Sequence, residues 1–444
     1  MKEREIALYA IIDILNEKAY NNIVLRRVLS RNSHLSMVQR AFVTELVNGT
    51  IRNMINIDYI ISQYSKTPLD KMKPVILNIL RMGVYQIIYM DKVPDSAACN
   101  ESVELAKMKG FGSLSGFVNG VLRNISRNKN NISYPDREKQ PVEHISVKYS
   151  YPKWIVEYWM QELDIDTIEK ICLSNRVPPK VSACINTLKT DKEGLKTMLS
   201  SDNITMTDGV FKKNALYLSR TRDITETSAF KYGLFHVMDE SSMLAVDILA
   251  PKAGDKVMDC CAAPGGKSFY SAYKMKNEGE IISADIYEHK LELIKDGVQR
   301  LGIKIIKPIL ADASEHKEEY DGKMDCVLVD APCSGFGLFR KKPDIKYNKT
   351  MEDVEALAKL QRDILSTCRL YVKQGGCLVY STCTISVKEN LENVKWFCDN
   401  FGFETEDISK YLNFDCPTAK DGYIQVLPCD FNTDGFFIAR FIKK

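Results

Sequence analysis

Two cysteines stand where apolar, strand-like runs of the chain end. Cys333 lies in the stretch V-D-A-P-C-S-G-F-G and Cys383 in Y-S-T-C-T-I-S. A lone cysteine is usually a small buried hydrophobic residue. A zinc pair is disfavoured, because the chain has no C-x-x-C motif and only five histidines. Since both thiols fall outside the periodic apolar pattern, and Asp330 lies close to the first, nucleophilic chemistry is the stronger hypothesis.

A run of small residues, D-C-C-A-A-P-G-G-K-S, occupies positions 259–268. Small residues after a strand let the backbone approach a ligand, and the helix that follows offers free amides. The run lacks the G-x-G-x-x-G of a dinucleotide site. It contains G-K-S, but Cys261 occupies the position of the first P-loop glycine, so an NTPase is the weaker alternative. The remaining candidate ligand is S-adenosylmethionine.

Two acidic residues support this cofactor. Asp285 ends the next strand-like run, where a carboxylate can accept the ribose hydroxyls, and Asp312 follows the third run, near the adenine. Either residue alone is more often a helix N-cap. Their occurrence at successive strand ends, together with the small-residue loop, favours S-adenosylmethionine over coincidence.

Two thiols, one carboxylate and a methyl donor suggest methylation of a cytosine. The C5 carbon of cytosine is a poor nucleophile, and addition of a thiolate to C6 makes it enamine-like. An acid at N3 stabilises the developing charge, and a base must remove the C5 proton before the thiol leaves. Cys383, Cys333 and Asp330 are candidates for these roles. Residue types alone do not say which cysteine attacks.

The elements that would position these residues follow a strand–helix alternation, which is typical of a parallel sheet with crossover helices. Ligands of such sheets bind at the carboxyl ends of the strands. A final pair of strands joined by P-C-D-F-N-T-D-G predicts an antiparallel hairpin. The predicted fold of residues 241–444 is a Rossmann-like α/β methyltransferase domain. The expected strands are Lys256–Cys260, Glu280–Asp285, Ile305–Leu310, Cys326–Asp330 and Cys377–Ser381, and the expected helices include Glu288–Leu301 and Met351–Val372.

The rest of the chain predicts a multidomain protein. Residues 1–130 repeat apolar residues at three- and four-residue spacing, which predicts an all-α bundle. Residues 131–142 are polar and contain two prolines, which predicts a linker. Residues 143–240 predict a small α+β domain of RRM-like type. Its expected elements are strands at Val181–Ile185, Leu216–Leu218 and Leu234–Met238 and a helix near Glu193–Leu199.

Positive charge is concentrated near the N-terminus. Residues 1–136 hold 18 Lys and Arg against 12 Asp and Glu, whereas the whole chain carries +3. A basic bundle, with Arg123 and Arg127 on its last helix, favours an anionic partner such as nucleic acid. Thirteen cysteines and an N-terminus unlike a signal peptide favour the cytoplasm. No apolar run is long enough for a bilayer, and we expect a monomer without a metal ion.

The motifs together resemble those of the RNA cytosine-5 methyltransferases of the NOL1/NOP2/Sun family. The resemblance rests on D-C-C-A-A-P-G-G-K, V-D-A-P-C-S-G, Y-S-T-C-T-I-S and R-K-K-P-D-I-K, and it covers residues from about 140 to the end. Residues 1–128 look like a NusB-type RNA-binding domain. This two-part arrangement is similar to that of bacterial enzymes that methylate 16S ribosomal RNA.

The resemblance implies a role for each site residue. Cys383 is the implied nucleophile and Cys333 the residue that assists product release, whereas DNA cytosine-5 methyltransferases attack with the P-C cysteine. Asp330 would lie between the methyl donor and the target base. The implied donor-binding residues are Cys261, Ala262, Ala263, Pro264, Gly265, Gly266, Lys267, Asp285, Asp312 and Asp330. The implied RNA-binding residues are Arg340, Lys341, Lys342 and Lys346.

The implied activity is S-adenosylmethionine-dependent methylation of C5 of one cytosine in 16S ribosomal RNA, with an unstacked target base. A tRNA cytosine-5 methyltransferase would share these motifs and stays the alternative. A non-catalytic RNA-binding or antitermination factor and a P-loop NTPase are weaker. Met238 stands where the family often has Gln, and Lys342 and Tyr347 stand where His and Trp are common. These departures lie outside the reacting groups.

Overall fold

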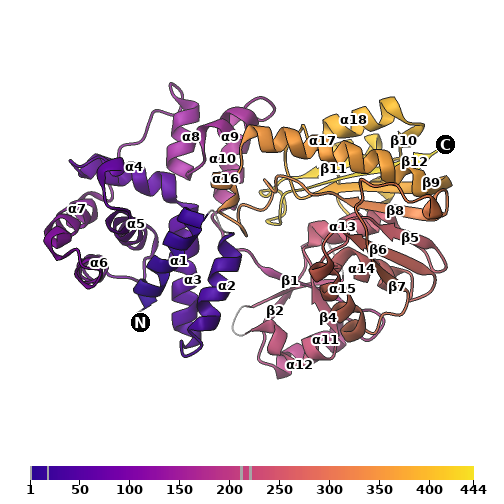
Figure 1. Ribbon diagram of the computed structural model, residues 1–444, viewed down its shortest axis with the longest axis horizontal. Coiled ribbons are helices and arrows are strands. Elements are labelled where there is room, and N and C mark those ends of the chain that lie inside the picture. Colours follow the sequence, from indigo (N-terminus) through magenta and orange to yellow (C-terminus); the bar gives the residue numbers. More distant parts are fainter. Residues whose placement is uncertain (1–2, 18–19, 211–213, 220–222) are drawn as a thin grey trace. The chain divides into compact units, whose positions relative to one another are not determined.

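The computed structural model describes residues 3–17, 20–210, 214–219 and 223–444 (Figure 1). The chain divides into two compact units. Unit 1 comprises Met1–Arg176 and Phe339–Asn348, and unit 2 comprises Val177–Leu338 and Lys349–Lys444. The boundary differs from the predicted linker at 131–142, because the helices that follow that segment belong to unit 1.

Unit 1 is helical, as the apolar periodicity predicts. The side chain of Ser36 accepts from the backbone of Gln39, whose own side chain accepts in return, and this capping box begins α3. Pro74 begins α5, where its missing N–H costs nothing. The helices are α1 (Glu3–Glu17), α2 (Asn21–Arg31), α3 (Met37–Arg52), α4 (Met54–Tyr64), α5 (Pro74–Tyr89), α6 (Asp95–Met108), α7 (Ser115–Asn128), α8 (Pro141–Tyr149), α9 (Lys153–Trp159), α10 (Ile165–Ser174) and α16 (Ile345–Asn348).

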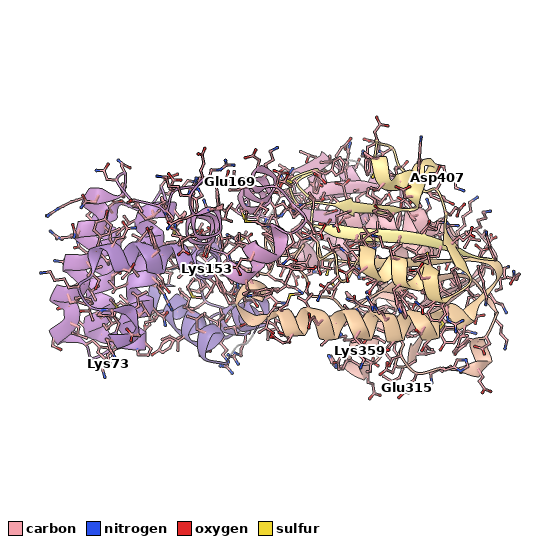
Figure 2. All side chains as sticks on the ribbon, turned by 90° about the horizontal axis from the view of Figure 1, so that it is seen from above. Lys73, Lys153, Glu169, Glu315, Lys359 and Asp407 are labelled. Atoms are coloured by element: carbon pink, nitrogen blue, oxygen red, sulfur yellow. The ribbon has the colours of Figure 1, made fainter. Side chains whose placement is uncertain are left out.

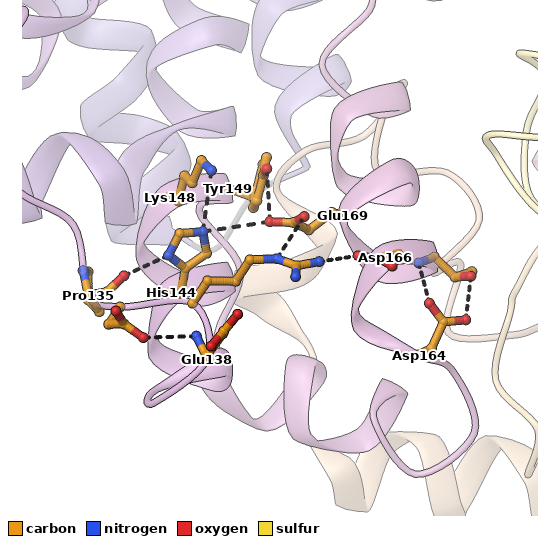
Figure 3. A network of polar contacts seen from close by, with 11 residues as sticks. Pro135, Glu138, His144, Lys148, Tyr149, Asp164, Asp166 and Glu169 are labelled. Atoms are coloured by element: carbon orange, nitrogen blue, oxygen red, sulfur yellow. Dashed lines mark hydrogen bonds and ion pairs between the residues drawn. The ribbon is translucent and has the colours of Figure 1, made fainter.

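The segment predicted as a linker is held against helices of unit 1. Figure 3 shows Glu169 of α10 at the centre of a polar network. Its carboxylate accepts from Arg137 Nε at 3.2 Å and from the Tyr149 hydroxyl at 3.2 Å. One ring nitrogen of His144 lies 2.6 Å from the Pro135 carbonyl. Because the segment pairs with α8 and α10 in this way, α8–α10 form part of the helical unit.

A ten-residue segment from the second half of the sequence also belongs to unit 1. Phe339 packs its ring against Tyr151 and Trp159, with centroids 5.5 and 6.0 Å apart. Lys346 of α16 donates to the carbonyls of Arg52, at 2.7 Å, and Ser150. Its ammonium lies 4.3 Å from the centre of the Tyr151 ring. Lys346 is 2% exposed, and this burial lowers its pKa well below the usual value.

Lys346→Ala is expected to destabilise unit 1 by about 2–4 kcal/mol, because it leaves two carbonyls without their donor and empties a packed site. Urea unfolding followed by circular dichroism measures this change. Lys73, an exposed lysine of unit 1, serves as the matched control, since Lys73→Ala should leave the unfolding midpoint unchanged. Equal unfolding midpoints for Lys346→Ala and Lys73→Ala would contradict a structural role for Lys346.

Unit 2 begins with a small antiparallel sheet of order β2-β3-β1-β4. Its β-α-β-β-α-β element order is that of a ferredoxin-like domain. Val181–Ile185 has the predicted bounds, and the other predicted elements lie within two residues of their observed bounds. β2 was not predicted, since its three residues carry no apolar alternation. The elements are β1 (Val181–Ile185), α11 (Lys192–Ser201), β2 (Met206–Asp208), β3 (Ala215–Leu218), α12 (Ser228–Lys231) and β4 (Phe235–Val237).

The larger sheet of unit 2 has the order β10-β12-β9-β8-β5-β6-β7, and β11 also pairs with β12. Strands β5 to β9 are parallel. β12 runs antiparallel to β9 and forms the predicted antiparallel pair with β11. The strands are β5 (Lys256–Asp259), β6 (Glu280–Asp285), β7 (Ile306–Leu310), β8 (Met324–Asp330), β9 (Val372–Thr382), β10 (Phe403–Thr405), β11 (Tyr423–Val426) and β12 (Phe436–Lys443).

Helices cover both faces of this sheet (Figure 1). Val257 packs in one core with α13, α14 and α15, and its neighbour Met258 packs in a second core with α17 and α18. This alternation puts apolar residues on both faces, as expected of buried parallel strands. The helices are α13 (Glu240–Leu249), α14 (Gly266–Lys274), α15 (Glu288–Leu301), α17 (Met351–Cys368) and α18 (Leu391–Asn400).

Charged side chains project from the surfaces of both units, and Figure 2 labels several of them. The exposed ones among the labelled residues are Lys73, Lys153, Glu315, Lys359 and Asp407. Within the described ranges, every helix is too short or too polar to cross a bilayer.

Candidate active site

The two cysteines singled out by the sequence lie side by side. β8 and β9 are parallel neighbours, with Asp330 paired to Ser381, and the two strands end at Asp330 and Thr382. Cys333 Sγ and Cys383 Sγ are 3.1 Å apart. The amide of Gly337 donates to the Cys383 carbonyl at 3.0 Å, which ties the two loops together. A side chain at Gly337 would collide with the backbone of Gly435, so the close approach of positions 337 and 435 requires glycine at position 337.

Asp330 ends β8 and is held by two donors. Lys267 Nζ donates to Oδ2 at 2.6 Å, and the Ser381 hydroxyl donates to Oδ1 at 2.7 Å. The Lys267 ammonium also lies 5.3 Å from the centre of the Phe436 ring. Lys267 therefore pairs with a carboxylate. The lysine of a P-loop instead contacts the phosphates of the bound nucleotide. This geometry disfavours the NTPase alternative.

The small-residue loop connects β5 to α14. Gly265 is the N-cap residue of α14 with a φ of 103°, a conformation that favours glycine. A side chain there would also collide with the ring of Phe269. The loop therefore keeps its backbone close to the sheet edge, next to Asp285, whose carboxylate accepts from the amide of Ala263 at 3.2 Å.

Two cavities of unit 2 meet at the loop, and Cys261, Ala263 and Asp330 line both. The larger has a volume of about 330 Å³ and includes Asp285 and Asp312. The smaller has a volume of about 170 Å³ and includes Lys267. The larger volume is within the range of small-molecule sites. Apolar walls with a few carboxylates suit a nucleoside.

The two acids of the larger cavity also have local structural partners. Asp285 accepts from the amide of Tyr287 at 3.1 Å, and Lys290 lies 3.9 Å away. Asp312 accepts from the amide and hydroxyl of Ser314 at 2.8 and 2.6 Å. Each carboxylate thus stabilises the turn after its strand, and each lines the cavity as well.

Asp259, the first residue of the loop motif, is a buried carboxyl. It accepts from the Ser268 hydroxyl at 2.7 Å, and burial raises its pKa to about 7. In the unfolded chain the Asp259 carboxyl has a pKa of 3.8, so it loses its proton at a lower pH than in the folded protein. The stability that the protonated group contributes is therefore full below pH 3.8 and is lost as the pH rises towards 7.

Asp259→Asn should therefore flatten the loss of stability between pH 4 and about 7, by roughly 1.4 kcal/mol per pH unit of the shift removed. Urea unfolding of unit 2 at pH 4.5 and pH 7.5 tests this difference. Asp296→Asn, at an exposed position of α15, is the control and should keep the wild-type dependence. Parallel pH profiles for wild type and Asp259→Asn would contradict the assignment.

Several residues that the sequence did not single out belong to the site. Ile286, Tyr287 and Leu360 line the larger cavity. The first two directly follow Asp285, so their position was the available signal. Leu360 is an exposed apolar residue of α17, and nothing local in the sequence marks it. Glu389 contacts the residue next to Cys333 and had only its nearness to Cys383 as a signal.

The basic residues expected to contact RNA separate into two groups. Arg340 and Lys346 are 3% and 2% exposed, so phosphate contact by these two does not agree with their burial. Lys341 is exposed and Lys342 is partly exposed. Phe339 and Lys346 contact residues of the helical unit, which the sequence motif alone does not reveal.

Three family models match the chain. The 16S rRNA methyltransferase RsmB/F model matches residues 246–442, and the NusB family model matches residues 1–127. A ferredoxin-like domain model of RsmF/B-like methyltransferases matches residues 151–225. These matches agree with the observed helical N-terminus, the small four-stranded sheet and the mixed sheet. The predicted fold class is therefore confirmed.

Similar proteins match over nearly the whole length. The probable ribosomal RNA small subunit methyltransferase B of Bacillus subtilis is 40% identical, covering 99% of this chain and 98% of that protein. The protein of the same name from Synechocystis is 32% identical, covering 99% of both chains. The crystal structure of PH0851 is 25% identical, with a TM-score of 0.82, and covers 100% of this chain and 99% of that one. The chain belongs to the RsmB/F family of 16S rRNA methyltransferases.

Proposed function

We propose that this protein transfers a methyl group from S-adenosylmethionine to C5 of one cytosine in 16S ribosomal RNA, through a covalent bond between Cys383 and C6 of the base. The observation that carries the proposal is the 3.1 Å separation of two thiols at the ends of neighbouring parallel strands. Asp330 and the cofactor-sized cavity lie at the same strand ends.

The larger cavity fits S-adenosylmethionine. Asp285 and Asp312 provide acceptors for ribose and adenine groups, and Ile286 and Leu360 provide apolar walls for the base. The loop residues Cys261 to Lys267 bring backbone and a cation next to Asp330. When bound, the cofactor supplies an electrophilic methyl group.

The reaction begins with the Cys383 thiolate, which forms a bond to C6 while the C5–C6 double bond supplies electron density to C5. Asp330 would form a hydrogen bond at N3 and, with the Lys267 ammonium 2.6 Å from its carboxylate, would stabilise the charge that develops there. The methyl group would pass to C5 as its bond to the donor sulfur breaks, leaving S-adenosylhomocysteine, and a base would then take the proton from C5. The C5–C6 double bond then re-forms, and the Cys383–C6 bond breaks with its electron pair returning to sulfur. Cys333, at 3.1 Å, is positioned to provide a proton for the departing thiolate.

RNA binding would involve the helical domain and the exposed basic residues. Arg123 and Arg127 are exposed on α7, and Lys341 is exposed beside the buried positions of its segment. The target base must leave its stack to reach Cys383, so a loop or partly unfolded RNA is the expected substrate. All thirteen cysteines lie within the described residues and none forms a disulfide bond, which is typical of proteins in a reducing compartment such as the cytoplasm.

A methyl-transfer assay with labelled S-adenosylmethionine and total RNA from a strain lacking the gene tests the proposal. Label in 16S ribosomal RNA, followed by bisulfite mapping to one cytosine, is the expected result. Label in tRNA alone would identify the tRNA enzyme instead. RNA binding without transfer would indicate a non-catalytic factor, and either outcome would overturn the proposal.

A further inference from the structure

A buried carboxylate, Glu389, lies behind the two cysteine loops. Glu389 is 0% exposed, and burial raises the pKa of its carboxyl group. The described residues contribute no ion pair to it, so its hydrogen bonds come from neutral donors. A carboxylate without a cation is costly in a protein interior unless such donors compensate. Its partners therefore indicate what it holds in place.

Two of these hydrogen bonds come from Ser334, the residue after Cys333. The Ser334 amide donates to Oε1 at 2.8 Å and the Ser334 hydroxyl to Oε2 at 2.6 Å. Gln361 donates to Oε1 at 3.0 Å, and the same amide group donates to the carbonyl of Pro332 at 2.9 Å. The residues on either side of Cys333 are thus held by Glu389 and its partner Gln361.

The same network reaches the loop of Cys383. The hydroxyls of Ser334 and Thr384 are 2.8 Å apart, and Thr384 is the residue after Cys383. Asn390 donates to the Thr384 carbonyl at 3.0 Å and accepts from the Thr382 hydroxyl at 2.6 Å. The neighbours of both cysteines are therefore fixed by two consecutive residues of one segment.

We propose that Glu389 is a positioning residue that sets the separation and orientation of the Cys333 and Cys383 thiols. The inference rests on the proposed function, since it assigns the two thiols to attack and release within one reaction. Attack and release need the thiols within a few tenths of an ångström of their places, and a displacement of about 1 Å costs about 10²-fold in rate. Glu389 does not line the cofactor cavities and acts through Ser334 and Thr384.

Glu389→Ala is expected to lower kcat for RNA methylation about 10²-fold and to leave KM for RNA and the Kd for S-adenosylmethionine within about twofold of wild type. Glu389→Gln should restore most of the rate. The glutamine oxygen can accept from the Ser334 amide and Gln361, and its amide can donate to the Ser334 hydroxyl, which then turns towards Thr384. Glutamine keeps the shape of glutamate and its places for hydrogen bonds but not its charge. Recovery of the rate by Glu389→Gln would therefore indicate that the hydrogen-bond geometry matters.

Ser334→Ala provides a second test in case Glu389→Ala does not fold. It removes the hydroxyl between Glu389 and Thr384 and keeps the backbone bond to Oε1, so kcat should fall at least tenfold with cofactor binding unchanged. The control is Glu392→Ala, which removes an exposed acid of α18. A wild-type kcat in either test variant would overturn the inference, as would a Glu389→Gln variant as inactive as Glu389→Ala. Failure of the proposed function differs from this, because the wild-type protein would then not methylate RNA.

Discussion

Cys383→Ala is expected to abolish methyl transfer to RNA, with a loss of at least 10⁴-fold. The alanine has no group that can bond to C6, so C5 stays a poor nucleophile. Folding and cofactor binding should persist, because the Cys383 side chain does not line either cavity beside the small-residue loop. Transfer of labelled methyl groups to 16S ribosomal RNA measures the activity, and equilibrium dialysis measures cofactor binding.

The control is Cys398→Ala on α18, a partly buried free cysteine outside the site. It should keep the wild-type rate. Full activity of Cys383→Ala would contradict the assignment of the nucleophile. If Cys333→Ala were inactive without forming a covalent product while Cys383→Ala retained turnover, the attack would have to be assigned to Cys333.

The parallel sheet was predictable because each strand combines an apolar run with a turn at its end. β6 and α15 have the predicted bounds, and β5 and β7 differ by one residue. α17 ends at Cys368 and not at Val372, since Val372 begins β9. The periodicity of an apolar helix end and an apolar strand start is similar, so this boundary is poorly marked in the sequence.

Other features depend on contacts between residues far apart in the chain. The pairing of the 131–140 segment with α8 and α10 arises from Arg137 and Glu169, and each looks like an ordinary solvated charge in the sequence. Lys346 looked like a phosphate ligand, but its partners are carbonyls of Arg52 and Ser150. A motif gives residue types and not the burial of each residue.

In the candidate site, too, some residues could be predicted from the sequence and others could not. The two thiols and Asp330 could be placed together from the rule that parallel strands end at one edge of a sheet. Glu389 could not, because its hydrogen bonds to Ser334 and Gln361 join the loops after β8 and β9 to helix α17. Local sequence gave no reason to prefer it over the neighbouring acid Glu392. Residues that position a site are harder to predict than residues that react.

Cys333→Ala is expected to trap a covalent protein–RNA adduct. Attack by Cys383 and methylation of C5 do not need the second thiol, so the adduct still forms. Its breakdown requires loss of the C5 proton and protonation of the Cys383 thiolate as the C6–S bond breaks. Cys333 Sγ, 3.1 Å from Cys383 Sγ, is the thiol placed to take part in that step. The adduct should appear on a denaturing gel as a band of reduced mobility that ribonuclease removes.

Two further variants sharpen this result. Cys333→Ala/Cys383→Ala should give no band, because the adduct depends on Cys383. Cys333→Ser keeps a small hydrogen-bonding group and should give a weaker band than Cys333→Ala, since a hydroxyl can partly replace the thiol as a proton donor. The absence of any band in Cys333→Ala, with methyl transfer at the wild-type rate, would show that release proceeds without Cys333. The close approach of the two sulfur atoms would then serve only the packing of the two loops.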